Sequence, residues 1–441
     1  MRLRVIGAGL CGCEAAWAAA GLGAEVELYE MKPAHMSPAH SSPLLAELVC
    51  SNSLKAARLE SAAGLLKEEM RRMGSVCMAA AAVSSVAAGG ALAVDRERFS
   101  AYITQRIKDH PRIHLHEKRV TAVPREETVI VATGPLTDGP LAEDIKTLCG
   151  RDTLSFFDAA APIVTADSVD MSTAFRASRY GRGEADEGDY INCPMNREEY
   201  EAFYTALISA EAAPLKDFDR PLTVYEGCMP IEIMAKRGPD TIRFGPLKPV
   251  GLRDPRTGHR PWAVVQLRRE NAAGSMYNLV GFQTNLRFPE QKRVFSMIPG
   301  LKDAEFVRYG VMHRNSFIDS PRLLQADFSL RTHPHIFIAG QLAGVEGYME
   351  SAAAGILAGI NAVRRMGGET PFVPPEITMT GALSRYISDQ TVARFQPMGA
   401  NFGLLPPLPT RIRDKKARYG ALSARALDWF DRMGLDGTEK E

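Results

Sequence analysis

The chain has 441 residues, 45% of them hydrophobic and 24% charged, which is enough for about two to four domains with a large core. Its formal net charge of +1 excludes a uniformly basic nucleic-acid-binding protein, so any contact with nucleic acid requires a local patch. Seven scattered cysteines and no recognisable leader favour a cytoplasmic protein, and no apolar run reaches membrane-spanning length.

The first thirty residues predict a strand, a glycine turn, a helix and a second strand. The apolar strand at 3–6 precedes a G-x-G-x-x-G turn, and the strand at 24–29 is followed by an acid. In a dinucleotide-binding unit these glycines allow a tight turn, close approach to a pyrophosphate and close helix packing, while the acid binds a ribose. The residues predicted to bind the dinucleotide are Gly7, Ala8, Gly9, Leu10, Cys11, Gly12 and Glu30.

Two later segments indicate which dinucleotide is bound. A buried-strand run at 128–136 contains Ala-Thr-Gly, and residues 335–363 predict a strand, a glycine turn and a helix of small residues. Alone, the last segment also fits a tightly packed core helix, but the three segments together resemble the FAD fold of glutathione-reductase-like flavoproteins. There the last helix directs its positive end at the flavin. FAD is therefore expected, with contacts from Thr133, Gly134, Gly340, Gln341, Glu346, Gly347 and Tyr348.

The composition changes between these flavin segments. Residues 158–319 are richer in proline, arginine and aromatic residues, with strand-like runs at 221–225, 241–244, 263–267 and 277–282 and a helix at 196–210. We therefore expect an α/β protein in which a glutathione-reductase-like, Rossmann-type FAD-binding domain (1–157 and 320–441) is interrupted by a smaller mixed α/β insertion domain (158–319). An amphipathic basic helix is expected near the carboxyl end.

Two cysteines are candidates for catalysis. Cys50 is expected after an apolar helical turn and before a Ser-Asn-Ser cluster that can cap a helix, and Cys228 follows the strand expected at 221–225. Backbone amides at such element ends can stabilise a thiolate, although an inert buried thiol is the alternative at both positions. Cys11 and Cys13 are expected to pack inside the dinucleotide turn. No two cysteines have C-x-x-C spacing, so the sequence does not predict a metal site.

Longer motifs outside the glycine turn are more specific. The chain contains, in this order, VIGAGLCGCEAAW, YEMKP, LAELVCSNSLK, VYEGCMPIE, RFGPLKPVGL, LVGFQTNLRFPEQ, YGVMHRNSFIDSP and IAGQLAGVEGYMESAAAGILAGIN. From residue 5 to about residue 402 it resembles the folate- and FAD-dependent tRNA uridine C5-methyltransferases, the TrmFO family. Cys11 and Cys13 depart from this family, which more often has small non-thiol residues there.

The resemblance implies C5-methylation of the T-loop uridine of tRNA to ribothymidine. It implies 5,10-methylenetetrahydrofolate as carbon donor and FAD, reduced by NADH or NADPH, as source of the hydride. Uracil C5 is a poor nucleophile, but addition of a thiolate to C6 creates an enolate whose C5 can attack a one-carbon unit. The resemblance assigns the catalytic thiols to Cys228, expected to attack C6, and Cys50, expected to act as general acid or base.

Substrate contacts are expected in the insertion domain. His313 is expected to stack on a pterin or the flavin, the alternative being a hydrogen-bonded loop histidine. Arg287 is expected to pair with a folate carboxylate or a phosphate. Basic residues around Trp262 form either a track for tRNA or a solvated basic face: Lys236, Arg237, Arg243, Lys248, Arg253, Arg256, Arg260, Arg268 and Arg269.

Three alternative functions stay open at this point. A flavoprotein that modifies wobble uridines shares the flavin segments, but in that family they are joined to a long carboxy-terminal helical domain. A plain NAD(P)H:flavin oxidoreductase needs neither Cys228 nor the basic insertion. A non-catalytic RNA-binding flavoprotein tolerates the loss of both Cys50 and Cys228. The oligomeric state is not predicted.

Overall fold

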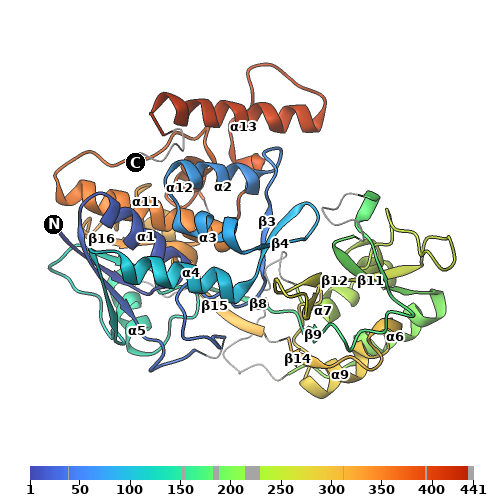
Figure 1. Ribbon diagram of the computed structural model, residues 1–441. Helices are drawn as coiled ribbons and strands as arrows, with labels where there is room; N and C mark the ends of the chain where they lie inside the picture. Colours follow the sequence, from blue (N-terminus) through green and yellow to red (C-terminus); the bar gives the residue numbers. More distant parts are fainter. Residues whose placement is uncertain are drawn as a thin grey trace.

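The computed structural model describes residues 1–37, 39–150, 154–181, 188–213, 229–310, 312–392 and 395–435, with backbone alone at 154–159, 313 and 314. Figure 1 shows a larger part on the left and a smaller part on the right, each built on its own sheet. Each part has a separate hydrophobic core, and the core of the smaller part consists of residues between 161 and 304. Within the described residues, no helix is both long and apolar enough to cross a membrane.

A five-stranded parallel sheet forms the centre of the larger part. Its strand order is β16-β7-β1-β2-β6, so the last strand in the chain lies at one edge, next to β7. The strands are β1 (Arg2–Ile6), β2 (Glu25–Glu30), β6 (Ile113–Glu117), β7 (Val129–Val131) and β16 (Ile336–Ile338). Because β1 lies between β2 and β7, the glycine turn at its carboxyl end is at the point where the strand order reverses. This sheet confirms the predicted Rossmann-type α/β fold.

Helices α1 (Leu10–Gly21) and α11 (Tyr348–Met366) pack with their backbones in contact. A Cβ on Gly355 would lie 2.1 Å from Cys11 O, and a Cβ on Gly359 would lie 2.4 Å from Ala15 O. Glycine is therefore required at both positions of α11. Cys11 and Cys13 are buried in this contact, and burial raises the pKa of both thiols. Their predicted packing role is confirmed.

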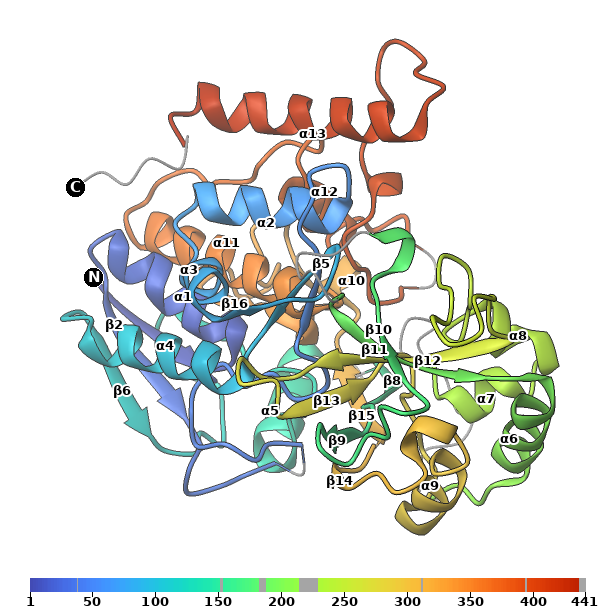
Figure 2. The same cartoon turned by 45° about the vertical axis from the view of Figure 1, so that its right-hand side comes forward.

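The other elements of the larger part cover the sheet and extend it. A small three-stranded sheet has the order β3-β5-β4. In Figure 2, α13 lies across the top of the molecule, above α2 and α12. The predicted amphipathic helix near the carboxyl end is thus confirmed. The bounds are α2 (Ala62–Arg72), α3 (Val76–Ser84), α4 (Arg96–Asp109), α5 (Gly139–Cys149), α10 (Ser320–Leu323), α12 (Met379–Tyr386), α13 (Lys415–Arg432), β3 (Ser53–Ala56), β4 (Ser85–Val86) and β5 (Ala91–Val94).

A buried glutamate joins α2 to the start of α12. Glu69 Oε1 accepts a hydrogen bond from Met379 N at 2.7 Å, and Oε2 accepts from Thr380 N and Thr380 Oγ1, both at 2.8 Å. Burial raises the pKa of Glu69 to about 7. A folded-state pKa above the ordinary value of 4.5 means that the contribution of Glu69 to stability falls as the pH rises between these two values.

We expect Glu69→Ala to lower the free energy of unfolding by about 3 kcal/mol, because it leaves two amides and a hydroxyl unpaired in the core. Chemical denaturation followed by circular dichroism measures the change. The neighbouring Glu68 is the matched control, since it forms only partly exposed ion pairs with Arg71 and Arg72, and Glu68→Ala should cost less than about 1 kcal/mol. Equal effects of the two substitutions would contradict the capping role of Glu69.

The smaller part contains a six-stranded antiparallel sheet of order β10-β11-β12-β13-β9-β14. Four helices, α6 to α9, lie beside it in Figure 2. Its elements are β9 (Ile163–Thr165), β10 (Phe175–Arg176), β11 (Tyr190–Met195), β12 (Ala263–Arg269), β13 (Met276–Leu279), β14 (Phe306–Arg308), α6 (Arg197–Ser209), α7 (Ile231–Ala235), α8 (Pro239–Phe244) and α9 (Phe288–Phe295).

Most of the elements predicted in this part are observed. The helix expected at 196–210 is α6, which Asn196 begins with a reciprocal capping box to Glu199. The strands at 263–267 and 277–282 correspond to β12 and β13. The strand predicted at 241–244 is wrong: these residues belong to α8, because Gly238 and Pro239 start a helix there. The run at 221–225 lies outside the described residues.

Two strands connect the two parts. β8 (Leu154–Ala159) and β15 (Met312–Phe317) pair antiparallel as a separate ribbon, which Figure 1 shows between the two sheets. The chain passes into the smaller part through β8 and returns through β15. The smaller part is thus inserted between two segments of the larger one, and both connections run along one ribbon.

Candidate active site

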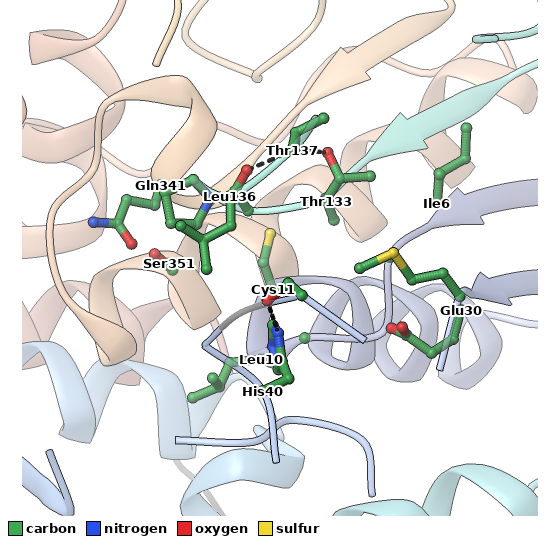
Figure 3. Close-up of a pocket in the computed structure, with 18 of the residues that line it drawn as sticks. Ile6, Leu10, Cys11, Glu30, His40, Thr133, Leu136, Thr137, Gln341 and Ser351 are labelled. Carbon is green, nitrogen blue, oxygen red and sulfur yellow. Dashed lines mark hydrogen bonds between the residues drawn. The ribbon is translucent and has the colours of Figure 1, made fainter. Parts of the chain in front are cut away.

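Three segments that are distant in sequence line a long groove at the carboxyl edge of the parallel sheet. The segments are the turn after β1, the chain after β7 and the chain from β16 into α11. Figure 3 shows side chains from all three facing the same space. About 1200 Å³ of empty space, the open solvent at its mouth included, lies along this groove. Among the predicted cofactor-binding residues, those that line it are Gly7, Gly9, Leu10, Cys11, Glu30, Thr133, Gly134, Gly340, Gln341 and Tyr348.

The remaining predicted cofactor residues lie behind this lining. Gly12 packs against the turn, since a Cβ there would lie 1.7 Å from Gly7 O. Ala8 N donates a hydrogen bond to Glu30. Glu346 Oε2 accepts a hydrogen bond of 2.7 Å from Gln341 Nε2, and Gly347 precedes the first residue of α11. These four residues therefore support the residues that line the groove without lining it themselves.

The glycine turn leaves room and hydrogen-bond donors for an anion. A Cβ on Gly9 would meet no atom within 4 Å, so the space in front of α1 is open. The first backbone hydrogen bond of helix α1 runs from Cys13 N to Gly9 O at 2.9 Å. The amides of Leu10, Cys11 and Gly12 precede it and therefore have no partner within the helix. Open space and free amides at a helix amino terminus fit a dinucleotide diphosphate.

Glu30 is positioned to bind a ribose. It is 8% exposed at the end of β2, its Oε2 accepts from Ala8 N at 2.9 Å, and its Oε1 accepts from Lys32 N at 3.0 Å. These two bonds hold the carboxylate beside the glycine turn, and each oxygen keeps a further lone pair for a ligand hydroxyl. The geometry thus fits the predicted contact.

The sequence reasoning missed the chain that closes one side of the groove. Ser37, His40, Glu47 and Val49 line it, as do residues 118–120 after β6. His40, labelled in Figure 3, has its Nδ1 2.6 Å from Ser37 Oγ. Residues 118–120 follow a parallel strand at the same sheet edge, so the order of the strands was the signal that could have found them.

The helical turn predicted before Cys50 is wrong. Residues 41–50 contain no helix. Lys32 Nζ donates to Ser42 O at 3.1 Å and also to Leu44 O, so a buried ammonium satisfies carbonyls that a helix would pair internally. Lys32 also lies 3.4 Å from Glu47 Oε2. The segment before Cys50 is therefore an ordered loop.

Cys50 is bound by the first residue of α11. Tyr348 Oη accepts hydrogen bonds from Cys50 N at 2.7 Å and from Ser51 N at 3.2 Å, and it lies 3.0 Å from Cys50 Sγ. Burial, and then the charge of Cys50, raise the pKa of Tyr348 well above its usual value, so the phenol stays protonated. Because two amides use the oxygen lone pairs, the phenolic hydrogen is directed at Sγ. This arrangement brings Cys50 to the edge of the groove and places a hydroxyl within hydrogen-bond distance of its sulfur.

The Ser-Asn-Ser cluster after Cys50 begins a strand rather than the predicted helix. β3 starts at Ser53, and Asn52 Nδ2 donates to Val94 O at 3.0 Å and to Arg269 O at 2.9 Å.

The inclusion of Arg268 in an exposed tRNA track is also wrong. Arg268 is buried, and its guanidinium donates to Asn52 rather than facing solvent.

The described lining of the groove includes neither Arg287 nor the second cysteine, and for His313 the structure describes the backbone alone. Cys228 lies outside the described residues, which resume at Met229. His313 is in β15, where its backbone pairs with Asp158 of β8. Arg287 precedes α9, and its guanidinium lies 3.0 Å from Glu211 Oε1 at the surface.

The basic residues near Trp262 are dispersed. Arg253, Arg256 and Arg260 lie in one exposed loop, where Arg256 pairs with Asp254 at 2.6 Å. Arg243 instead stacks on Trp262, with its guanidinium carbon 3.7 Å from the ring centroid. None of these residues lines the groove. The exposed loop thus remains the one part of the predicted track that offers several guanidinium groups to solvent.

Comparison with known proteins agrees with this geometry. Residues 2–370 match the family described as glucose inhibited division protein A. The chain is 58% identical over 429 residues to the methylenetetrahydrofolate--tRNA-(uracil-5-)-methyltransferase TrmFO of Pelotomaculum thermopropionicum, covering 97% of each chain. It is 57% identical over 427 residues to the protein of the same name from Geobacter sulfurreducens, again covering 97% of each.

A solved structure shares the fold. Aquifex aeolicus GidA superposes with a TM-score of 0.70 at 16% identity, covering 100% of this chain and 74% of that one. With a family match over most of its length and full-length relatives of such high identity, the chain belongs to the TrmFO family, within the wider family of glucose inhibited division protein A.

Proposed function

We propose that this protein methylates C5 of the T-loop uridine of tRNA, with 5,10-methylenetetrahydrofolate as carbon donor and NADH or NADPH as reductant of bound FAD. The name shared by its full-length relatives supports a folate-dependent tRNA uracil C5-methyltransferase. The observation that carries the proposal is the hydrogen bond between Cys50 and Tyr348, because it joins a thiol to a residue that lines the dinucleotide groove. Since tRNA is the substrate, the reaction belongs in the cytoplasm.

The groove residues fit FAD. The amides of Leu10 and Cys11 would hold the diphosphate, Glu30 a ribose, and the start of α11 at Tyr348 and Ser351 the flavin end. Bound FAD, once reduced, supplies the hydride that converts a carbon at the formaldehyde level into a methyl group.

The two cysteines divide the remaining chemistry. The Cys228 thiolate forms a bond to uracil C6, and the electron pair of the C5–C6 double bond moves into an enolate. C5 then bonds to the one-carbon unit. Cys50 removes the C5 proton as a thiolate, and the resulting enolate expels the nitrogen that carried the one-carbon unit, which leaves a methylene group on C5. Addition of the hydride to this methylene would give the methyl group and re-form the enolate, and the C5–C6 double bond returns as the Cys228 sulfur leaves C6. The Tyr348 hydroxyl favours the basic form of Cys50 that this step requires.

The inserted part is proposed as the tRNA side, with residues 158–319 as its extent and 1–157 and 320–441 as the FAD-binding domain. Its separate core and its exposed loop of arginines support this division. The target is proposed to be the T-arm. His313 and Arg287 remain candidates for the folate, since a histidine ring can stack on a pterin and a guanidinium can pair with a carboxylate.

Neutralising the exposed loop is expected to weaken tRNA binding. Replacing Arg253, Arg256 and Arg260 together by glutamine should reduce the magnitude of the slope of log affinity against log salt concentration by about 2 to 3. Each contact between a cation and a phosphate contributes about 0.9 to that magnitude. Filter binding across a salt series measures the slope, and the FAD content should stay unchanged. The matched control replaces three exposed arginines of the larger part, Arg98, Arg106 and Arg112. An unaltered slope would indicate that tRNA binds elsewhere, with the basic residues at 411–416 as the next candidates.

One assay tests the proposed function as a whole. Purified protein, methylenetetrahydrofolate, NADH or NADPH and unmodified tRNA should produce ribothymidine at the T-loop position, detected by nucleoside mass spectrometry. Reductant consumption without any modified nucleoside would favour the plain flavin oxidoreductase. Modification at a wobble uridine would favour the activity of the related flavoprotein family instead.

A further inference from the structure

Guanidinium groups from three different elements hold the loop around Cys50. Arg96 begins α4 in the larger part, whereas Arg268 of β12 and Arg308 of β14 belong to the smaller part. All three donate hydrogen bonds into residues 48–52. The loop that carries the candidate catalytic thiol is therefore fixed from both parts of the molecule.

Arg268 makes the best-defined of these contacts. Its Nε donates to Asn52 Oδ1 at 3.0 Å, and its Nη2 donates to Ser51 Oγ at 2.9 Å. Arg268 is 8% exposed, and burial lowers its pKa while the charges of Glu270 and Cys50 oppose that effect. A buried guanidinium is costly unless its surroundings are anionic or rich in acceptors, so its placement against the loop that carries Cys50 requires an explanation.

Arg308 and Arg96 complete the arrangement. Arg308 donates to Val49 O, directly before Cys50, and Arg96 donates to Leu48 O. Burial lowers the pKa of Arg308, and the charge of Cys50 is among the groups that oppose this. Both arginines donate to the backbone of the loop, so they restrain its path.

The charges around this loop do not cancel. Glu270, which is buried and pairs with Arg96, is the carboxylate that acts on all three arginines. Three arginines and the one carboxylate that acts on all of them thus surround the loop, and Tyr348 Oη lies 3.0 Å from the sulfur. A surplus of positive charge together with a hydrogen-bond donor is the environment that stabilises a thiolate.

We propose that Arg268 and Arg308 are positioning residues that hold Cys50 at the groove and stabilise its thiolate, so that the smaller part completes the reactive centre of the larger one. The role of Cys50 in methyl transfer rests on the proposed function. The state of its thiol does not, because it can be measured without tRNA or folate.

The test is the rate at which iodoacetamide alkylates Cys50 in the FAD-loaded protein at pH 7, followed by mass spectrometry of the Cys50 peptide. We expect Arg268→Met and Arg308→Met each to slow alkylation by about tenfold, because fewer molecules carry the thiolate. The same variants should lower kcat for methyl transfer with the KM for tRNA unchanged. Arg269→Met is the matched control: it neighbours Arg268 on β12 and should leave the rate unchanged.

A second variant tests the sign of the electrostatic effect. Glu270→Gln removes the opposing charge and should accelerate alkylation of Cys50, whereas loss of an arginine slows it. Slowing by Glu270→Gln as well would overturn the proposal, since it would indicate general disruption of the loop. Unchanged rates in Arg268→Met and Arg308→Met would also overturn it, provided that both retain the wild-type flavin absorbance. If Arg268→Met does not fold, the half-buried Arg308 decides the outcome alone.

Discussion

Replacing Cys228 by alanine is expected to lower methyl transfer by at least about 1000-fold, the scale on which loss of a nucleophile falls, while FAD stays bound. In the sequence this thiol lies outside every segment predicted to bind the flavin, so the flavin absorbance should not change. The variant should also form no covalent complex with tRNA that carries 5-fluorouridine at the target. Gel mobility under denaturing conditions, followed by peptide mapping, measures that complex.

Cys50→Ala separates the two thiol roles. It should also lose turnover, but as the acid or base it acts after the attack on C6, so this variant is expected to accumulate the covalent complex. Cys149→Ala is the control for general thiol loss, because Cys149 ends α5 and is not among the residues that line the groove. A complex mapped to Cys50 would exchange the roles of the two cysteines, and full methylation by Cys228→Ala would reject the nucleophile assignment.

The nucleotide-binding part of the fold was predictable because local signals and tertiary structure agree there. The turn at Gly7 has a φ of 96°, and a Cβ would lie 2.6 Å from Ala132 O, so glycine marks both the conformation and the contact with β7. The close helix crossing at Gly355 and Gly359 left a similar signal in α11. Where backbone atoms are in direct contact, a larger side chain does not fit, so glycine recurs at fixed positions and the motif can be recognised in the sequence.

The surroundings of Cys50 were not predictable for the opposite reason. Its contact with Tyr348 joins residues 298 positions apart, and the loop before it is held by side chains rather than by a periodic hydrogen-bond pattern. Arg268 illustrates the same limit. In sequence it is one basic residue among several, but the alternation of side chains along β12 turns it toward Asn52. Charge composition alone does not distinguish a solvated arginine from one that supports a reactive centre.

The position of Tyr348 links cofactor binding to the state of the thiol. It is the first residue of α11, the helix whose start lines the flavin end of the groove, and its hydroxyl contacts Cys50. Any ligand that shifts the start of α11 therefore changes the hydrogen bond to sulfur. Arg268 and Arg308 act on the same loop from the inserted part. The Cys50 loop is thus the place where the cofactor side and the proposed tRNA side of the molecule meet.

A carboxylate at the mouth of the glycine turn is expected to abolish FAD retention. Because a Cβ on Gly9 meets no atom within 4 Å, Gly9→Glu should fold normally while its side chain enters the space proposed for the diphosphate. Repulsion and lost space together should weaken binding by at least about 100-fold, and the purified variant should be colourless. Gly21→Glu is the matched control: Gly21 also has open space around its Cβ, but at the far end of α1, so this variant should remain yellow. Absorbance at the flavin band, with circular dichroism to verify folding, distinguishes the two. A yellow Gly9→Glu protein, or a wild-type protein that cannot be reconstituted with FAD, would contradict the assignment of the groove and with it the source of the hydride.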